Sequence, residues 1–311
     1  MSIKAQTFSG LLSSPSTTEW LSARDSSIIS RFEDSRDFDS QTLSHYASNT
    51  QLITQQGVDI NSRDSQGRTA LHRAIIEYYP LVDDDKELNI IELLLDHGAD
   101  VGVQDTMLFT PLHLAAGKGK YAVVQLLLRR GASVHARDTN SSTPLHHASW
   151  HGHPNAIQLL LGHGADTEAQ NNEAYAPLHL AAWQGRVAAM QKLLEHGARI
   201  DVRDKLSWTP LHHASWHGHP DIIQSLLEHG ADIETQNYNN STPLHLAAQR
   251  GEVAATQNLL GYGARVDAGD RFFFTPLYRA TWHEHPDVIQ LLLDAGKKKG
   301  SYLYTSSLYE L

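Results

Sequence analysis

Apolar residues recur three and four positions apart in several short stretches of the chain. In the segment "DIIQSLLEHGAD", which begins at Asp221, the side chains of Ile222, Ile223, Leu226 and Leu227 would share one face of a helix. A glycine follows this apolar run, and glycine favours the left-handed conformation that ends helices. The pattern predicts an amphipathic helix that stops just before the glycine.

The same pattern repeats along the chain with a fixed period. The motif "TPLH", or a close variant, begins every 33 residues at Thr110, Thr143, Ala176, Thr209, Thr242 and Thr275. An earlier copy, "TALH", begins at Thr69, 41 residues before the next, so it carries 8 extra residues. Threonine suits a helix N-cap and proline suits the first helical turn, so each motif predicts the start of a helix.

Two further positions recur with this period. Glycines that would stop the second helix lie at Gly98, Gly131, Gly164, Gly197, Gly230, Gly263 and Gly296. Residues that would open a turn lie at Asp64, Asp105, Asp138, Asn171, Asp204, Asn237 and Asp270. Each unit therefore predicts a turn, a short helix, a tight loop, a longer helix and a glycine stop. Such a pair cannot bury its apolar face alone, so we expect the units to stack into a solenoid.

These residues closely resemble the ankyrin repeat. The stretch "TPLHLAAQRG" (Thr242–Gly251), followed by "NLLGYGARVDA" (Asn258–Ala268), matches the family pattern almost throughout, and the resemblance covers about residues 61–296. It implies an all-α fold, an ankyrin-repeat solenoid of stacked helix-turn-helix units with short β-hairpin loops. The family often has glycine three residues after the turn residue, and here only Gly67 fits. Because other residues replace it, we expect less regular hairpin tips at Leu108, Ser141, Ala174, Ser207, Asn240 and Phe273.

The repeats suggest a division of the chain into four parts. We expect a Ser/Thr-rich leader over residues 1–37, partly disordered or helical, and a degenerate capping repeat over 38–63. Seven ankyrin repeats follow over 64–296, with the 8-residue insertion in the first, where "LVDDDKE" (81–87) should lengthen the loop between its helices. The tail over 297–311 could cap the array or fray, and the sequence does not decide between these.

Composition narrows the classes of function. The 311-residue chain has a net charge of −10, which argues against direct nucleic-acid binding because phosphate backbones need a basic face. The sequence contains no cysteine, so disulfides and thiolate metal sites are excluded. No signal peptide or membrane-length apolar run is present in it. We expect a monomeric intracellular protein, in the cytoplasm, the nucleus or both, with no cofactor and no membrane contact.

The stretch "TPLHHASWHGHP" occurs twice, from Thr143 and from Thr209. Over Thr143–Asn171 and Thr209–Asn237, 23 of 29 positions are identical, so the copied unit spans two repeats, or 66 residues. Copying explains the recurrence of this histidine-rich motif without two active sites.

Thirteen of the 20 histidines have structural positions. The resemblance implies hydrogen bonds between neighbouring hairpins for His72, His113, His146, His179, His212 and His245. The helix C-terminus, whose dipole favours a histidine, accounts for His97, His163, His196 and His229. The family's "GH" loop accounts for His153, His219 and His285. The remaining histidines are His45, His135, His147, His151, His213, His217 and His283.

The pairs His147/His151 and His213/His217 are the candidate metal ligands. Each pair is spaced i, i+4 on one predicted helix, but zinc needs three or four ligands, and the counterparts in the repeat between the pairs are Leu180 and Gln184. No nucleophile or carboxylate partner is evident beside them, so we assign no catalytic residue. We therefore interpret these four histidines as surface residues and expect no metal.

The resemblance also implies a contact surface. In the family, the two residues that follow the small pair of the first helix lie on the concave face, beside the residue that precedes the "TPLH" threonine. We predict partner contacts on this face at Phe109, Lys118, Trp150, His151, Tyr175, Trp183, Gln184, Trp208, Trp216, His217, Arg250, Phe274, Trp282 and His283. Aromatic anchors are typical of protein interfaces, although the tryptophans could instead pack on neighbouring repeats.

Three hypotheses follow. The first is a non-enzymatic scaffold or regulatory adaptor that binds another protein along the concave aromatic and histidine groove. A positively charged or apolar epitope would suit the net charge of the chain. The second is an unusual enzyme, or a small-molecule or metal binder, that uses the groove as a pocket, with His147, His151, His213 and His217 as its polar groups. The third is a spacer whose partner contacts only the flanks.

Overall fold

The computed structural model describes residues 59–76 and 84–298, and these form an elongated array of helix pairs. The first helices are α5 (Ala70–Ile76), α7 (Pro111–Lys118), α9 (Pro144–His151), α11 (Pro177–Trp183), α13 (Pro210–Trp216), α15 (Pro243–Arg250) and α17 (Pro276–Trp282). The second helices are α6 (Asp84–Asp96), α8 (Tyr121–Arg129), α10 (Pro154–Gly162), α12 (Val187–Glu195), α14 (Pro220–Glu228), α16 (Val253–Gly261) and α18 (Pro286–Lys298). The helices and their order confirm the predicted repeat unit.

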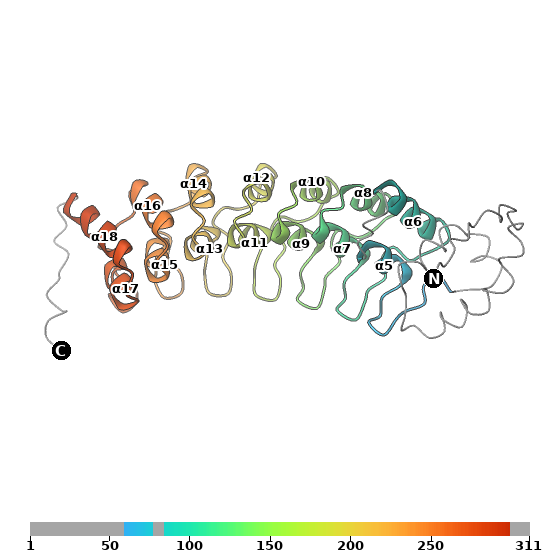
Figure 1. Cartoon of the computed structure of the whole chain (residues 1–311), viewed down its shortest axis with the longest axis horizontal. Coiled ribbons are helices and arrows are strands. Elements are labelled where there is room, and N and C mark those ends of the chain that lie inside the picture. Colours follow the sequence, from blue (N-terminus) through green and yellow to red (C-terminus); the bar gives the residue numbers. More distant parts are fainter. Residues whose placement is uncertain (1–58, 77–83, 299–311) are drawn as a thin grey trace, which may run out of the picture.

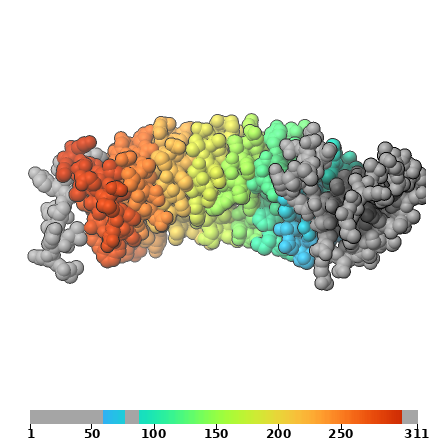
Figure 2. Space-filling model, in the orientation of Figure 1, coloured from blue at the N-terminus to red at the C-terminus, as the bar shows by residue number. Residues whose placement is uncertain are grey.

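Figure 1 shows three layers along this array: the second helices, the first helices and the hairpin loops. The described residues contain no β-strand, and backbone hydrogen bonds hold each loop. In the second repeat, Asp105 N donates to Phe109 O at 3.0 Å, and Thr106 N donates to Gln66 O of the preceding loop at 3.0 Å. Figure 2 shows that the repeats pack into one continuous body without a break.

The core runs through the whole array. Leu178 of α11 and Leu193 of α12 are fully buried, and their equivalents in the other repeats are buried in the same cluster, except that Leu277 of the last repeat is only partly buried against it. Alanines such as Ala181 and Ala214 are also fully buried. Because alanine has a small side chain, consecutive first helices can pack closely. Each repeat therefore buries its apolar face only against its neighbours, as expected of a solenoid.

The hairpin tips correct one expectation. Six residues that replace glycine there, such as Leu108 and Ser141, have φ of 55–61°, beside 71° at Gly67, so the tips are regular. The physical reason is the turn aspartate or asparagine. Asp105 Oδ1 accepts the backbone N–H groups of Met107 and Phe109 at 2.8 and 2.9 Å, and these bonds hold the left-handed residue between them.

Two other expectations about helix ends need correction. Gly296 lies inside α18 and is buried, so the helix stop predicted there is wrong, whereas the six preceding stop glycines have positive φ. The insertion in the first repeat does more than lengthen a loop. Asp84 begins α6, which has 13 residues against 9 in α8, so part of the insertion extends the helix.

Several predicted segments lie outside the described residues. These are the leader over 1–37, the capping repeat except for residues 59–63, residues 77–83 with the first part of the insertion, and the tail from residue 299. No helix of the described ranges has both the length and the apolar character needed to cross a bilayer.

Candidate interaction surface

The "TPLH" histidines form a ladder that positions the hairpins beside the first helices. In six repeats the ring Nδ1 accepts the backbone N–H of the N-cap residue at 3.0–3.3 Å. The ring Nε2–H donates to a hairpin carbonyl of the next repeat at 2.9–3.1 Å. The predicted structural role of these histidines is confirmed. Burial lowers the pKa of His113, His146, His179 and His212 to about 4, so these rings are neutral at pH 7.

The predicted roles of the histidines at helix C-termini and in the "GH" loops are also confirmed. His163 Nδ1 donates to Leu159 O at 2.8 Å, and the three other histidines at helix C-termini make the same contact. His153 Nε2 donates to Gly117 O of the preceding repeat at 3.0 Å, and His219 and His285 do likewise. These contacts satisfy carbonyls that helix ends leave free.

Four of the five turn aspartates pair with a side chain nine residues later on the first helix. Asp138 Oδ2 contacts His147 Nε2 at 2.8 Å, and Asp204 Oδ2 contacts His213 Nε2 at 2.9 Å. In the first and last repeats an arginine takes the place of the histidine, as Arg279 does beside Asp270. In the other three repeats the residue nine positions later is leucine. Two of them have an uncharged turn residue, Asn171 or Asn237, and in the third Asp105 lies 3.6 Å from Arg68. The sequence therefore avoids burying a carboxylate without a partner.

This pairing corrects the interpretation of two histidines. We expected His147 and His213 to be surface residues without a carboxylate partner, but each has one, and His213 is only 3 % exposed. The signal was present in the sequence as the nine-residue spacing. It was not recognised because the turn residues were considered only as turn formers.

The predicted aromatic positions meet in a continuous cluster at the centre of the array. Trp183 stacks on His213 and on His217 of the next repeat, with ring centroids 5.3 and 5.0 Å apart. Tyr175 lies edge-on to Trp183 at 5.6 Å, and Trp150 lies at the same distance on the preceding repeat. The tryptophans thus pack on neighbouring repeats and still remain half-exposed.

The cluster continues into the fifth and sixth repeats. Trp208 contacts His213 at 5.0 Å and Trp216 at 5.6 Å, and the guanidinium of Arg250 lies 5.1 Å from the Trp216 ring centre. Burial, together with His213, His219 and Arg250, lowers the pKa of His217 to about 4.

The remaining predicted contact residues divide by exposure and position. Lys118, His151, Arg250, Trp282 and His283 are exposed, and the Trp282 side chain is 71 % accessible. Phe109 contacts His147 one repeat later, outside the central cluster, and Gln184 is half-buried at the end of α11. Phe274 stacks on Tyr278, which stacks on Trp282, so these rings form a separate group in the last repeat. Their role in binding stays a prediction.

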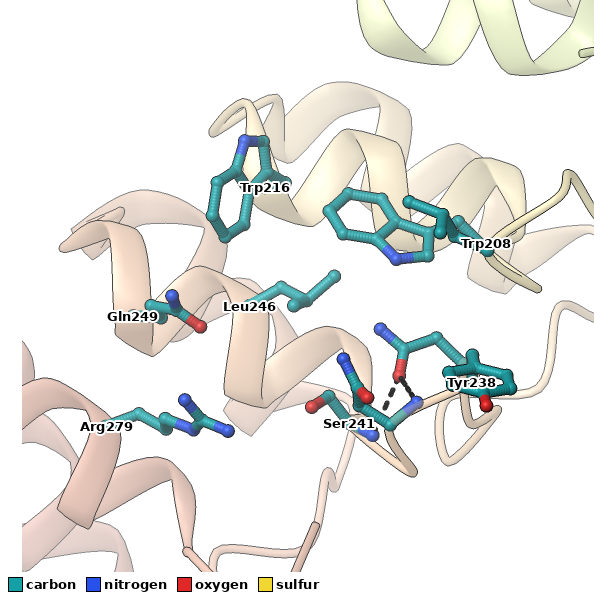
Figure 3. Close-up of a pocket in the computed structure, with 10 residues that line it drawn as sticks. Trp208, Trp216, Tyr238, Ser241, Leu246, Gln249 and Arg279 are labelled. Atoms are coloured by element: carbon teal, nitrogen blue, oxygen red, sulfur yellow. Dashed lines mark hydrogen bonds between the residues drawn. The ribbon is translucent and has the colours of Figure 1, made fainter. Parts of the chain in front are cut away.

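A pocket of about 260 Å³ opens beside the cluster, between the fifth and sixth repeats. Its lining residues are Leu206, Trp208, Trp216, Asn237, Tyr238, Asn239, Ser241, Leu246, Gln249 and Arg279. Figure 3 shows the two indoles facing Leu246, with Gln249 and Arg279 toward one end and Ser241 and Tyr238 toward the other. Sequence reasoning missed Leu206, Tyr238, Leu246 and Arg279. They lie neither directly after the small pair of the first helix nor directly before the "TPLH" threonine, the positions taken from the family pattern.

The histidine pairs do not gather further metal ligands. Among the described residues, no group of three histidine, aspartate or glutamate side chains converges in a way that could hold a metal ion. In His147 and His213, moreover, Nε2 is already hydrogen-bonded to an aspartate.

Comparison with known proteins agrees with this architecture. The family model "Ankyrin repeats (3 copies)" matches residues 81–171, 166–237 and 234–302, which is more than half of the chain. The potassium channel AKT1 of Oryza sativa, in subspecies indica and japonica, is 40% identical over 67 residues, which are 22% of this chain and 6% of the channel. The chain thus spans a small fraction of these curated relatives.

A solved structure resembles the array over most of its length. The human ASB11 ankyrin repeat domain superposes with a TM-score of 0.65 at 28% identity, over 73% of this chain and 98% of that domain. The 33-residue period, the histidine ladder, the family model and this superposition agree, and the chain belongs to the ankyrin-repeat family.

Proposed function

We propose that this chain is a non-enzymatic scaffold that binds another protein across the surface of its first helices and hairpin loops. Ankyrin repeats are generally protein–protein interaction domains, and the family is typically non-enzymatic. A more specific role as a regulatory adaptor would follow from the identity of the partner.

The single observation that carries the proposal is the aromatic cluster around Trp183. Tryptophan, tyrosine and histidine rings from the third to the fifth repeats contact one another at 5.0–5.6 Å, and several remain half-exposed. Such rings are held rigidly by their neighbours, so a partner can bury them at a small cost in conformational entropy. Buried tryptophan and tyrosine are also the side chains that contribute most to binding at interfaces.

The test is an affinity capture from a cell lysate with the full chain. The double variant Trp150→Ala/Trp216→Ala should lose partners that the wild type retains, because it removes two rings from the surface and leaves the core intact. Tyr121→Ala is the matched control, since it removes an exposed aromatic ring from the N-terminus of a second helix. An identical set of partners for the wild type and the double variant would contradict the proposal.

A further inference from the structure

The pocket between the fifth and sixth repeats has smaller residues at two lining positions than the earlier copy of the duplicated unit. Ser241 and Gln249 line it. At the equivalent positions, 66 residues earlier, the chain has Tyr175 and Trp183. There the two rings pack against each other and against His213, so they fill the corresponding space. The later copy has Trp216 in place of Trp150 and Trp208 in place of Ser142, and its smaller Ser241 and Gln249 line an open pocket beside these two indoles.

The size of the pocket suits a single side chain. At about 260 Å³ it is smaller than the roughly 300–1,000 Å³ that is typical of sites for drug-sized ligands. Its walls are the indoles of Trp208 and Trp216, and Leu246 is buried beside them. An aromatic or large aliphatic side chain would bury apolar area against all three.

The charges around this pocket are positive although the chain as a whole is acidic. Arg250 lies over Trp216, Arg271 lies over Tyr238 at 5.8 Å, and Arg279 lines the pocket. Arg279 is paired with the buried Asp270, whereas no carboxylate of the described residues lies within ion-pair distance of Arg250 or Arg271.

The distribution of acidic residues over the helices explains this reversal. The seven first helices of the described ranges contain no aspartate or glutamate. Carboxylates are instead found on second helices and in loops. Glu252 and Glu284 are the nearest to Arg250 and Arg279 in sequence on their C-terminal side, and Asp270, which precedes Arg271, is paired with Arg279. The net charge of −10 therefore does not describe the surface that carries the pocket.

We propose that this pocket takes one large apolar side chain from an acidic segment of the partner protein, whose carboxylates bind Arg250 and Arg271. The inference rests on the proposed function and specifies the chemistry of its partner. The expectation from net charge was a positively charged or apolar epitope. This inference keeps the apolar side chain and reverses the sign of the charge around it. Nucleic acid would also offer flat rings and negative charge, but the overall charge of −10 opposes it.

The probe is a random peptide library displayed on phage and selected against the full chain. Enriched peptides should combine a large apolar residue with flanking aspartate or glutamate, and their affinity should fall as salt is raised. Fluorescence polarisation with the synthesised peptides then measures the variants. Ser241→Tyr/Gln249→Trp fills the pocket with the residues of the earlier copy, so we expect a loss of roughly thirtyfold, the scale of an interface hot spot. Arg250→Glu should weaken binding by about tenfold or more through charge repulsion.

Two controls keep the result interpretable. Gln249→Ala enlarges the pocket rather than filling it and should keep the affinity within about threefold, which excludes a general effect of substitution at this site. Thermal unfolding of each variant shows whether the array remains folded.

The outcomes separate this inference from the proposed function. Enrichment of basic peptides, no enrichment, or tighter binding of a single-stranded oligonucleotide than of any peptide would overturn the inference. If enriched peptides lose affinity in Trp150→Ala but keep it in Ser241→Tyr/Gln249→Trp, the surface binds partners and the assignment to the pocket is wrong. Failure of the proposed function would appear independently, in the lysate capture.

Discussion

Histidine has several structural roles in this chain, and its side-chain chemistry explains each of them. A neutral imidazole has one donor and one acceptor, so a ladder histidine such as His212 can accept from Thr209 N and donate to Ser241 O. No other side chain of this size offers both groups in a planar ring. The same ring at a helix C-terminus, as in His163, donates to a free carbonyl. A high content of histidine is therefore explained by repetition of backbone contacts.

The ladder makes stability dependent on pH. The pKa of His113, His146, His179 and His212 is lowered to about 4 by burial, below the usual value near 6.5, so the unfolded chain binds more protons in this range. The free energy of unfolding should be constant above about pH 7. Below that it should fall by up to about 1.4 kcal/mol per pH unit for each histidine until the pH reaches about 4. Urea unfolding between pH 4.5 and 8 checks this.

His212→Ala provides the control for this dependence, because it removes one of the ladder rings whose pKa is lowered to about 4. Its slope between pH 6.5 and 4.5 should be smaller than that of the wild type, although the variant is less stable at pH 7. An unchanged slope would show that other groups cause the loss of stability.

The paired histidines allow a direct test of the metal hypothesis. Because Nε2 of His147 and of His213 is bonded to a buried aspartate, and no third ligand converges, we expect no tight zinc binding at pH 7. Isothermal titration of the full chain with zinc, with His147→Ala/His151→Ala and His213→Ala/His217→Ala as comparisons, measures it. Stoichiometric binding that disappears in either double variant would instead support the small-molecule or metal-binding alternative.

At the scale of a single helix and its hairpin, the chain has two alternative pairs of residues at the turn position and the helix position nine residues later. Odd-numbered repeats place a histidine or arginine beside a turn aspartate, while the fourth and sixth combine a turn asparagine with leucine. Both keep the turn oxygen that accepts two backbone N–H groups, as Asn237 and Asp204 show. The charged turn residue occurs only with a partner, because a lone buried carboxylate would destabilise the fold.

Exchange of one pair for the other tests this explanation. His213→Leu alone leaves the Asp204 carboxylate without its partner and should destabilise the chain by about 3 kcal/mol. Adding Asp204→Asn reproduces the combination found at Asn237 and Leu246 and should recover most of the loss. A double-mutant cycle by urea unfolding measures the coupling. Independent, additive effects of the two substitutions would refute the pairing.

At the scale of the whole molecule, the core is continuous but its contacts are only between neighbours. Leu178 in the middle of the array and Leu292 in the last helix are both fully buried in one cluster. In such an array each repeat is stabilised by its own helices and by its interfaces with adjacent repeats. The last repeat has one described neighbour, so it should unfold at lower cost than the middle repeats.

Substitution of a buried leucine in the middle of the array and of one in its last repeat distinguishes local from global unfolding. Leu178→Ala and Leu292→Ala should each destabilise the chain by about 2–5 kcal/mol, the usual range for a buried leucine. Hydrogen exchange should show loss of protection confined to the last repeats for Leu292→Ala and spread over the central repeats for Leu178→Ala. Identical, chain-wide loss of protection in both variants would contradict the nearest-neighbour description.

The sequence by itself determined the period, the helix starts and the histidine ladder, because each depends on residues a few positions apart or one repeat apart. The N-cap threonine, the proline and the stop glycine act locally, and a fixed 33-residue offset turns local contacts into contacts between repeats. It failed at Gly296, which lies buried inside α18 instead of ending the helix. It also failed at the hairpin tips, where hydrogen bonds to the turn residue outweigh the preference for glycine.

Only the tertiary structure decided what the surface offers to a partner. Whether His213 is buried, whether Trp183 fills a space that Gln249 leaves open, and where the arginines gather all depend on side chains from three consecutive repeats. The net charge of the chain and the contact positions implied by the family resemblance do not distinguish one repeat interface from another. Burial and charge at one site are set by the side chains that surround it in space, and for this chain those come from the stacking of its repeats.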